Sequence, residues 1–428
     1  NNLIKNFLKD KLFLLMLQKS LMTDIFLEEL LTKIRYEILV SLKNNKSDVL
    51  KEYNEFIISL SEQCFLNEYI YNQKKEEVSY INNLKKSVEK SKKINEFDIA
   101  ILGSYIPLYS SSIIVNKLLK YKSKSVLFNN LVEMQIREPF KEEKLKKTIQ
   151  SFGKISDSIS KKVKKQYEEN PYPRWRYTYS HLPVKFVNVV NHLIKPNEIK
   201  NTKNLDKLDI LIAGCGTGKQ IVLSNVYRNA SILGIDLSLK SISYAKRKIQ
   251  ELGLKNVQFL QSDILQISKL KRKFDFIECS GVLHHMKSPL QGIKILVGLL
   301  KPNGLMRIGL YSKVARQDIT RARNYIKENH IKSTIKNIKN YRQVIINQRN
   351  DKQLQKILYR RDFYSTSSAR DLMFHTQEHQ FTLPQISNIL KNNNLEFLGF
   401  ADVDAKKKYS KLFPSDIKNI SLENWNKF

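Results

Sequence analysis

Cysteine is scarce in this sequence. Its 428 residues include only three, at positions 64, 215 and 279, and no two of them form a C-x-x-C pair. Neither a disulfide framework nor a zinc site is therefore expected, and no metal ion is predicted. A reducing cytoplasm fits this usage best.

Long apolar runs are also lacking. The most apolar stretch, residues 12–22, is interrupted by Gln18 and Lys19 and is shorter than a membrane span. No secretory signal is recognisable at the start of the sequence. The sequence therefore predicts no membrane partner and a cytoplasmic location.

Acidic residues are few beside basic ones. The sequence has 74 Lys and Arg against 41 Asp and Glu, a formal net charge of +33 at pH 7. Such a charge permits binding to nucleic acid or acidic substrates without selecting between them. The lysines are scattered along the chain and no arginine–aromatic stripe stands out. Compositional drift is therefore favoured as the explanation, and nucleic-acid binding stays open.

The sequence contains two regions that differ in their pattern of apolar residues. Residues 1–165 show apolar residues three and four apart, as in 24–39, which follows a capping Asp24, and in 76–88. An all-α N-terminal domain is expected there, with residues 166–205 as a linker or lid. The remainder, 206–428, is expected to be an α/β domain.

In this second part short apolar strands alternate with helices. The expected strands are 208–214, 231–236, 256–263, 274–280, 304–311 and 395–400. This alternation predicts a Rossmann-like, doubly wound, mostly parallel sheet covered by helices on both faces. A basic helical insertion is expected at about 313–360, after the fifth strand.

A glycine loop, A-G-C-G-T-G, follows the first of these strands at 213–218. Glycines let the backbone turn sharply and approach a ligand that a β-carbon would exclude. Asp236 ends the second strand, where a carboxylate can accept both hydroxyl groups of a ribose. Asp263 ends the third, where it can accept a hydrogen bond from an exocyclic amine such as that of adenine. The combined register predicts a site for a nucleotide-like cofactor.

Five motifs follow one another at these strand ends: L-I-A-G-C-G-T-G (211–218), G-I-D (234–236), S-D-I-L (262–265), C-S-G-V-L-H-H-M (279–286) and L-K-P-N-G (300–304). Together they resemble the class I S-adenosylmethionine-dependent methyltransferases. A dinucleotide dehydrogenase matches less well, because the spacing G-x-G-x-x-G is absent. Four further segments are similar to a bacterial group of these enzymes that contains N-P-Y-P-R-W and is often fused to tetratricopeptide repeats: 63–70, 167–175, 308–316 and 370–382.

The resemblance implies S-adenosylmethionine as the cofactor. It places cofactor binding on residues of the motifs: Ala213, Gly214, Cys215, Gly216, Gly218, Asp236, Leu237, Ser262, Asp263, Ile264 and Ser280. One departure from the family pattern is Ile212, where many members carry an acidic residue near the methionine end of the cofactor. The resemblance therefore implies no carboxylate contact from that position.

Three residues after the fourth and fifth strands are the candidates for catalysis. His284 and His285 follow the fourth strand and Tyr311 ends the fifth, so all three should face the carboxyl edge of the sheet. One histidine is predicted to act as a base or to orient the substrate, and Tyr311 to contact it. The alternative is that His285 packs over the cofactor and His284 caps the next helix.

The stretch Q-Y-E-E-N-P-Y-P-R-W-R-Y (166–177) is rigid, aromatic and cationic. Its prolines are separated by a tyrosine and it precedes the sheet, so it does not match the N-P-P-Y motif of enzymes that methylate a flipped base. We expect a stiff lid over the cofactor or substrate pocket, or else a hydrophobic anchor between domains. The lid residues would be Asn170, Tyr172, Arg174, Trp175 and Arg176, with one arginine meeting a carboxylate.

The segment H-T-Q-E-H (375–379) matches the H-x-x-E-H pattern of zinc proteases, but its flanks alternate as in an extended chain. His375, Glu378 and His379 are instead predicted to line the substrate side of the pocket, or to form a structural ion-pair cluster. The acceptor is unidentified: V-L-H-H favours a small molecule, and a protein docked on the helical domain, RNA or DNA, and a non-catalytic scaffold are the alternatives.

Overall fold

The chain folds into two compact units. The computed structural model describes residues 2–44, 47–178, 182–199, 207–224, 227 and 229–428. The helical unit comprises Asn1–Lys144 and Asp318–Phe374, and the sheet unit comprises Leu145–Gln317 and His375–Phe428. Residues 179–181 and 200–205 of the predicted linker lie outside the described residues.

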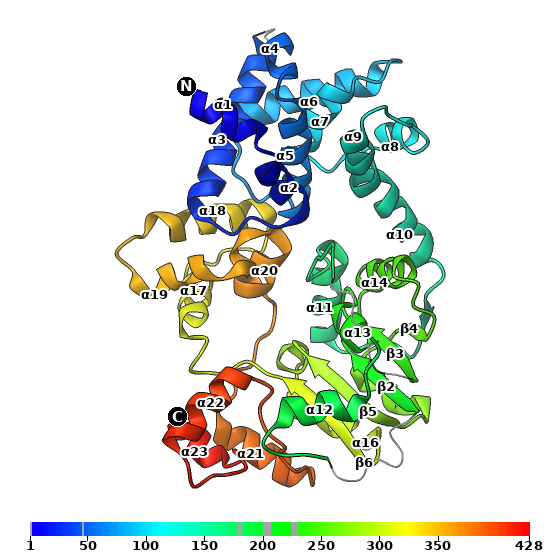
Figure 1. Ribbon diagram of the computed structural model, residues 1–428, viewed down its shortest axis with the longest axis vertical. Helices are drawn as coiled ribbons and strands as arrows, with labels where there is room; N and C mark the ends of the chain where they lie inside the picture. The colour runs from blue at the N-terminus through cyan, green and yellow to red at the C-terminus, as the bar shows by residue number, and fades with distance from the viewer. Residues whose placement is uncertain (1, 45–46, 179–181, 200–206, 225–226, 228) are drawn as a thin grey trace. The chain divides into compact units, whose positions relative to one another are not determined.

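The helical unit joins amphipathic helices around one apolar core (Figure 1). Asp24 caps α3 by accepting a hydrogen bond from the N–H of Leu27, as its place before an apolar repeat predicts. The helices of this unit are α1 (Asn2–Lys9), α2 (Lys11–Lys19), α3 (Ile25–Lys43), α4 (Ser47–Lys51), α5 (Asn54–Leu66), α6 (Lys75–Lys90), α7 (Glu96–Gly103), α8 (Ser112–Leu118), α9 (Val126–Val132), α18 (Ile335–Asn347), α19 (Lys352–Gln355) and α20 (Thr366–Phe374). Two more, α10 (Glu138–Lys146) and α17 (Gln317–Glu328), cross a boundary between the units in sequence.

The two units divide the sequence differently from the predicted domains. The predicted insertion after the fifth strand belongs to the helical unit, because Ile338 and Ile345 of α18 share a buried core with Leu17 and Leu31. Residues 145–165 belong to the sheet unit instead of the helical one. Periodicity identifies an apolar helix face, but it does not say which distant segment covers that face.

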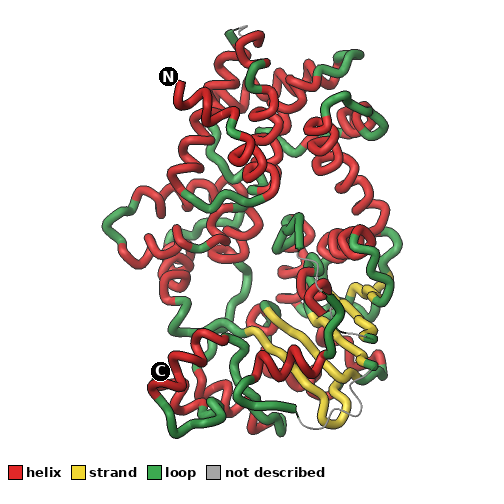
Figure 2. The backbone as a smooth tube through the Cα atoms, in the orientation of Figure 1, coloured by secondary structure: helices red, strands yellow, loops and turns green. Residues whose placement is uncertain are grey.

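The sheet unit contains one parallel sheet, whose strands lie side by side in Figure 2. The strands are β1 (Gln150–Ser151), β2 (Leu208–Ala213), β3 (Ala230–Asp236), β4 (Val257–Gln261), β5 (Phe274–Ser280) and β6 (Leu300–Gly309). Their order is β1-β4-β3-β2-β5-β6, and every pairing is parallel. This architecture confirms the predicted Rossmann-like fold and brings the ends of β2 to β5 to one edge, where such sheets bind ligands.

Side chains that alternate along the strands contribute to two apolar cores, one on each face of the sheet. Ile210 and Phe276 pack on one face with apolar residues of α12 (Phe186–Ile194), α13 (Lys219–Ser224) and α14 (Leu239–Glu251). Leu211 and Ile277 pack on the other with residues of α15 (Ile264–Ile267) and α16 (Pro289–Gly298). Both faces of a parallel sheet are thus buried, as its continuous apolar strands require.

The edges of the sheet differ from the prediction. The short strand β1 was not predicted and pairs with β4 beyond the expected edge. Residues 395–400 form no strand: Phe400 packs on Trp425 of α23 (Leu422–Lys427), near α21 (Leu383–Asn392) and α22 (Val403–Leu412). The predicted turn L-K-P-N-G lies within the span of β6, where the register with β5 shifts. The apolar residues of 395–400 therefore pack in a cluster of helices and not in the sheet.

Among the residues that the structure describes, none belongs to a helix both long enough and apolar enough to cross a membrane. The helix α11 (Ser158–Glu169) precedes the aromatic lid segment, and it lies in the sheet unit together with the glycine loop. The predicted lid and the predicted cofactor residues are therefore parts of one compact unit.

Candidate active site

The glycine loop between β2 and α13 adopts a backbone that only glycine tolerates easily. Gly214, Gly216 and Gly218 all have positive φ, at +75°, +50° and +87°. The N–H groups of Gly214 and Cys215 both donate to the carbonyl of Ile235 on β3, at 2.8 Å. A β-carbon on Gly214 would lie 2.2 Å from a methyl group of Val282, so the loop is also tightly packed. The sequence-predicted turn is therefore present.

Replacing Gly214 by alanine should destabilise the fold more than the same change at Gly253. Both positions are left-handed, at φ +75° and +69°, so each variant loses about 1–2 kcal/mol to backbone strain. Only at position 214 does the new methyl group meet another side chain, and such overpacking costs about 1–3 kcal/mol more. Urea unfolding of the two variants measures the difference, and equal losses would contradict it.

Asp236 lies at the end of β3 with its carboxylate turned toward the glycine loop. Oδ2 accepts a hydrogen bond from the N–H of Gly216 and Oδ1 from the N–H of Ser238, both at 2.9 Å. Burial raises the pKa of Asp236 to about 6, although these two N–H groups pull it down; the nearby carboxylate of Glu168 adds to the rise. The carboxylate is thus placed where the sequence predicts a ribose, and it remains ionised at neutral pH.

The pKa of Asp236 makes cofactor affinity depend on pH. A carboxylate accepts two hydroxyl hydrogen bonds better than a carboxylic acid does, so a bound ribose favours the ionised form. The pKa of Asp236 in the cofactor-free protein is about 6. Acidification below that value should therefore lower the affinity for S-adenosylmethionine, by up to about tenfold per pH unit. Calorimetric titration from pH about 8 to about 5 tests this, and a constant dissociation constant would contradict it.

The other predicted cofactor residues fall into two groups. Asp263 is buried at the end of β4 and caps α15 by accepting from the N–H of Leu265 at 3.0 Å. Ser262 donates to the carbonyl of Phe152 at 2.9 Å, so its hydroxyl supports the chain next to β1. The backbone oxygen of Leu237 accepts from Gln261 at 2.9 Å. Asp263 therefore combines a capping role with a position at the site edge.

Three of the predicted residues have side chains directed into the protein. Cys215 is fully buried in the core beneath the loop, and burial raises the pKa of its thiol well above the usual value. Ala213 and Ile264 belong to the core on the opposite face. Ser280 is only partly buried, at the carboxyl end of β5. For Ala213, Cys215 and Ile264, only backbone atoms are available to a ligand.

The lid segment is anchored on the glycine loop. Trp175 donates its indole N–H to the carbonyl of Thr217 at 3.0 Å, and the Thr217 hydroxyl donates to the carbonyl of Pro173. A β-carbon on Gly216 would lie 3.1 Å from the carbonyl oxygen of Tyr172. The ring of Trp175 meets Tyr244 of α14 edge to face at 6.4 Å. Trp175 thus contributes both to covering the loop and to the core beside it.

The remaining lid residues surround this anchor. Asn170 ends α11 and donates its N–H to Gln166 at 3.0 Å. Lys248 of α14 donates to the backbone oxygen of Arg176, whose guanidinium lies 5.6 Å from the ring of Tyr177. The Nε atom of Arg174 is buried. A pairing of either arginine with a carboxylate stays a prediction.

His284 is buried against aromatic rings. It is fully buried, its ring stacks on Tyr311 at 3.7 Å, and it meets His285 edge to face at 4.2 Å. Neither ring nitrogen has a hydrogen-bond partner among the described residues. Burial lowers the pKa of His284 to about 2. His284 is therefore neutral at any physiological pH and is a poor proton acceptor, which leaves His285 as the better candidate base.

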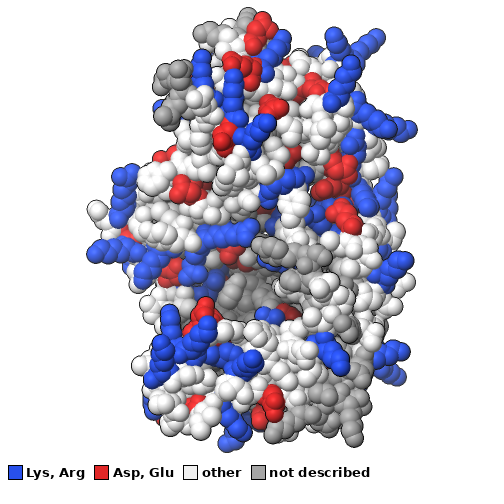
Figure 3. All heavy atoms as spheres, viewed as in Figure 1, with Lys and Arg blue, Asp and Glu red and all other residues white. Residues whose placement is uncertain are grey.

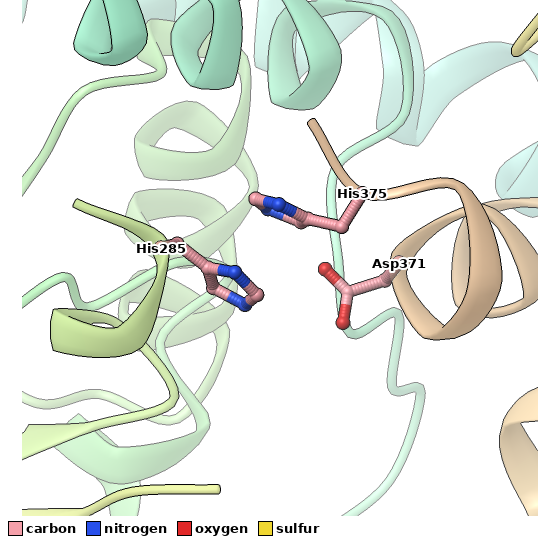
Figure 4. A group of neighbouring side chains, drawn as sticks. All are labelled: His285, Asp371 and His375. Atoms are coloured by element: carbon pink, nitrogen blue, oxygen red, sulfur yellow. The ribbon is translucent and has the colours of Figure 1, made fainter. Parts of the chain in front are cut away.

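His285 is held by a carbonyl from a distant part of the sequence. Its Nδ1 lies 2.7 Å from the carbonyl oxygen of Gln377, so Nδ1 carries the proton and the lone pair of the neutral ring is on Nε2. Its ring stacks on His375 with 3.5 Å between the ring centroids, and Figure 4 shows the two side chains next to each other. His375 accepts from the N–H of Gln377 at 3.2 Å and lies 3.3 Å from the hydroxyl of Tyr167. These contacts fix the orientation of the His285 ring.

The segment after His375 lies along the end of β6 and carries an ion pair. Arg316 donates two hydrogen bonds to the buried carboxylate of Glu378, at 2.8 and 2.9 Å, and its guanidinium lies 3.6 Å from the ring of Tyr311. His379 donates its N–H to the carbonyl of His284 at 2.7 Å. The predicted residues His375, Glu378 and His379 are therefore brought beside His284, His285 and Tyr311.

Sequence reasoning missed several residues of this site. Thr217, Tyr244 and Lys248 hold the lid, and Gln377 orients His285. Arg316 lies in the segment 308–316, whose likeness to the bacterial group assigns this arginine no role. Only its closeness in sequence to Tyr311, five residues earlier, indicates a place near the site. A carbonyl acceptor such as that of Gln377 leaves no trace in residue type.

Residues 201–362 match the sequence model of a family described as a methyltransferase domain. This match covers less than half of the chain and supports S-adenosylmethionine as the cofactor. The glycine loop and Asp236 fit the ribose of that cofactor, since the carboxylate stands beside a loop whose three glycines leave no room for β-carbons.

Curated relatives match parts of the chain. An uncharacterized protein of Synechococcus is 24% identical over 59% of this chain and 63% of its own length. One of Rickettsia prowazekii is 32% identical over 34% and 58% respectively. A ubiquinone biosynthesis O-methyltransferase of Coxiella burnetii is 32% identical over 26% and 49%. The chain thus covers less than two thirds of each of these relatives.

Among solved structures, PKMT2 from Rickettsia typhi in complex with AdoHcy aligns with a TM-score of 0.43 and 18% identity, over 58% of this chain and 52% of that one.

Proposed function

We propose that this chain transfers the methyl group of S-adenosylmethionine to a hydroxyl group of a small-molecule acceptor. The observation that carries the proposal is the carboxylate of Asp236, which ends β3 and binds the N–H of Gly216 in the glycine loop. A glycine-rich loop next to an ionised carboxylate is the arrangement that a ribose requires at this sheet edge.

Two carboxylates hold the nucleoside part of the cofactor. Asp236 accepts hydrogen bonds from the ribose hydroxyls, and Asp263, at the end of the neighbouring strand, accepts from the adenine amine. When bound, S-adenosylmethionine supplies a methyl group already activated by a positively charged sulfur. The chain itself has to orient the acceptor and exclude water. Trp175 and Tyr172, anchored over the glycine loop, provide a cover for that purpose.

His285 would take the proton of the acceptor hydroxyl on Nε2 while the methyl group leaves the sulfur for the acceptor oxygen. Gln377 holds the Nδ1 proton at 2.7 Å and so keeps the lone pair on the opposite nitrogen. An acceptor that carries a proton at neutral pH, such as a hydroxyl group, needs such a base. His284, with a pKa of about 2, packs against Tyr311 beside it, and Tyr311 contacts the acceptor.

Two observations support a small-molecule acceptor. The Coxiella burnetii relative is named an O-methyltransferase of ubiquinone biosynthesis, although the match covers about half of it. On the face drawn in Figure 3, Lys and Arg are scattered among acidic and neutral residues and are not gathered into one continuous stripe. A basic stripe is the usual footprint of a protein that binds nucleic acid.

The experiment is transfer of a labelled methyl group. The chain is incubated with labelled S-adenosylmethionine and bacterial extract separated into small molecules, protein and nucleic acid. Label in the small-molecule fraction, absent with Asp236→Asn, supports the proposal. Label in protein would indicate docking on the helical domain, and label in nucleic acid, lost steeply with salt, would indicate an RNA or DNA methyltransferase. Binding of the cofactor without any transfer would favour the non-catalytic scaffold.

A further inference from the structure

Glu278 places a buried carboxylate on the same face of the sheet as Asp236. It is paired in register with Ile212 of β2, which is paired in turn with Gly234 of β3. Paired residues of parallel strands project to one face, and side chains alternate along each strand. Asp236, two residues after Gly234, therefore shares this face. Since β2 lies between β3 and β5, the two carboxylates belong to strands about 10 Å apart.

Few groups within the protein satisfy this carboxylate. The hydroxyl of Ser280 donates to it at 3.3 Å, and Nη1 of Arg307 lies 3.8 Å away, too far for a hydrogen bond. Only 8% of the Glu278 side chain is exposed, and burial raises its pKa against the opposing effects of Arg307 and Ser280. A buried carboxylate is costly unless it is paired and hydrogen-bonded, so the group is suited to a cationic ligand.

The carboxylate leans toward the edge of the sheet that holds the site. Ser280, its hydrogen-bond donor, is the last residue of β5, and β5 leads directly into the loop of His284 and His285. The glycine loop follows β2, the strand between β5 and Asp236. If the ribose of the cofactor lies at Asp236, its amino-acid end can therefore reach β5 by extending across β2. Ile212, the residue of β2 in this row, is buried and offers no charge.

We propose that Glu278 binds the ammonium group at the amino-acid end of S-adenosylmethionine. The inference rests on the proposed function, because it takes the ribose to lie at Asp236. Arg307, paired in register with Glu278 on β6, sets a positive charge beside the negative one. An adjacent guanidinium and carboxylate match the zwitterionic amino acid of the cofactor. Glu278 is thus the second anchor of the cofactor, two strands away from the first.

The test compares two ligands with the variant Glu278→Gln. S-Adenosylhomocysteine and 5′-methylthioadenosine share the nucleoside and a neutral sulfur, but only the first carries the amino acid. Loss of a hydrogen-bonded charge pair should weaken S-adenosylhomocysteine about 10- to 100-fold in calorimetric titration. The affinity for 5′-methylthioadenosine should not change.

Two control variants separate this inference from the proposed function. Asp275→Asn removes another buried carboxylate of β5, one that pairs with Lys301 at 2.8 Å near the opposite end of the strand, and should leave both affinities unchanged. Asp236→Asn should weaken both ligands. If Glu278→Gln weakens both equally, or neither, while Asp236→Asn weakens both, Glu278 does not bind the ammonium group and the cofactor site stands. If the wild-type chain binds neither ligand, the proposed function fails as well.

Discussion

Replacing Asp236 by asparagine should reduce the affinity for S-adenosylmethionine about 100-fold or more. The carboxylate can accept both ribose hydroxyls, and hydrogen bonds to a charged group contribute about 1.5–3 kcal/mol each. Asparagine retains one acceptor oxygen and loses the charge, so at least one of these bonds is lost and the other weakened. Isothermal titration of the wild-type and variant chains measures the change directly.

The same variant carries its own control for folding. The pKa of Asp236 in the folded chain, about 6, is above the value of 3.8 expected for an unperturbed aspartate. The fold therefore favours the protonated form, and the charge lowers stability progressively as the pH rises from about 4 through 6. Asparagine removes that charge but can accept only one of the two N–H hydrogen bonds of Gly216 and Ser238, so urea unfolding of the variant has to be measured beside its affinity. Unchanged affinity in a well-folded variant would remove Asp236 from the cofactor site.

Replacing His285 by asparagine should lower kcat by about 10²- to 10⁴-fold with the acceptor found by label transfer, the range that a positioned base contributes. Cofactor affinity should change little, because His285 is assigned to the acceptor and not to the cofactor. Asparagine keeps a polar group near Gln377 but has no nitrogen that accepts a proton at neutral pH.

The control for His285 is His192→Asn. His192 is an exposed histidine of α12 with no assigned role in the site, so its replacement should leave kcat unchanged. The pH dependence of kcat separates the roles of His285: loss of a base removes the decline in rate on the acid side, whereas loss of mere positioning lowers the rate at every pH. A variant with wild-type kcat would assign the proton transfer to another group.

The cofactor half of the site could be predicted from the sequence because its determinants are local. The glycines at 214, 216 and 218 lie in the loop that follows β2, Asp236 ends β3, and Asp263 lies two residues after the end of β4. Parallel strands bring such ends together at one edge, whatever the loops between them do. The position of Asp236 at that edge followed from this rule.

The acceptor half could be predicted only as a set of candidates. The sequence places His284 and His285 side by side and does not distinguish them. The difference arises from burial, which lowers the pKa of His284, and from Gln377, which lies 92 residues after His285. The same limit applies to Glu278, whose place inside an apolar strand indicates a strand residue and not a ligand-binding one.

Long-range packing also explains the errors in the fold. Residues 395–400 alternate as a strand does, but their phenylalanines complete a cluster with Trp425 instead of joining the sheet. The segment β1 is two residues long and has no apolar alternation to reveal it. Neither feature can be read from its own residues, because both depend on partners far along the chain.

The most direct test of the account is calorimetric titration of the unmodified chain with S-adenosylmethionine at neutral pH. The account predicts binding at one site with micromolar affinity, and an increase in the thermal unfolding temperature when the cofactor is in excess. Absence of both binding heat and stabilisation would contradict it: the glycine loop and Asp236 would then be structural, and the fold would serve as a scaffold without the reaction.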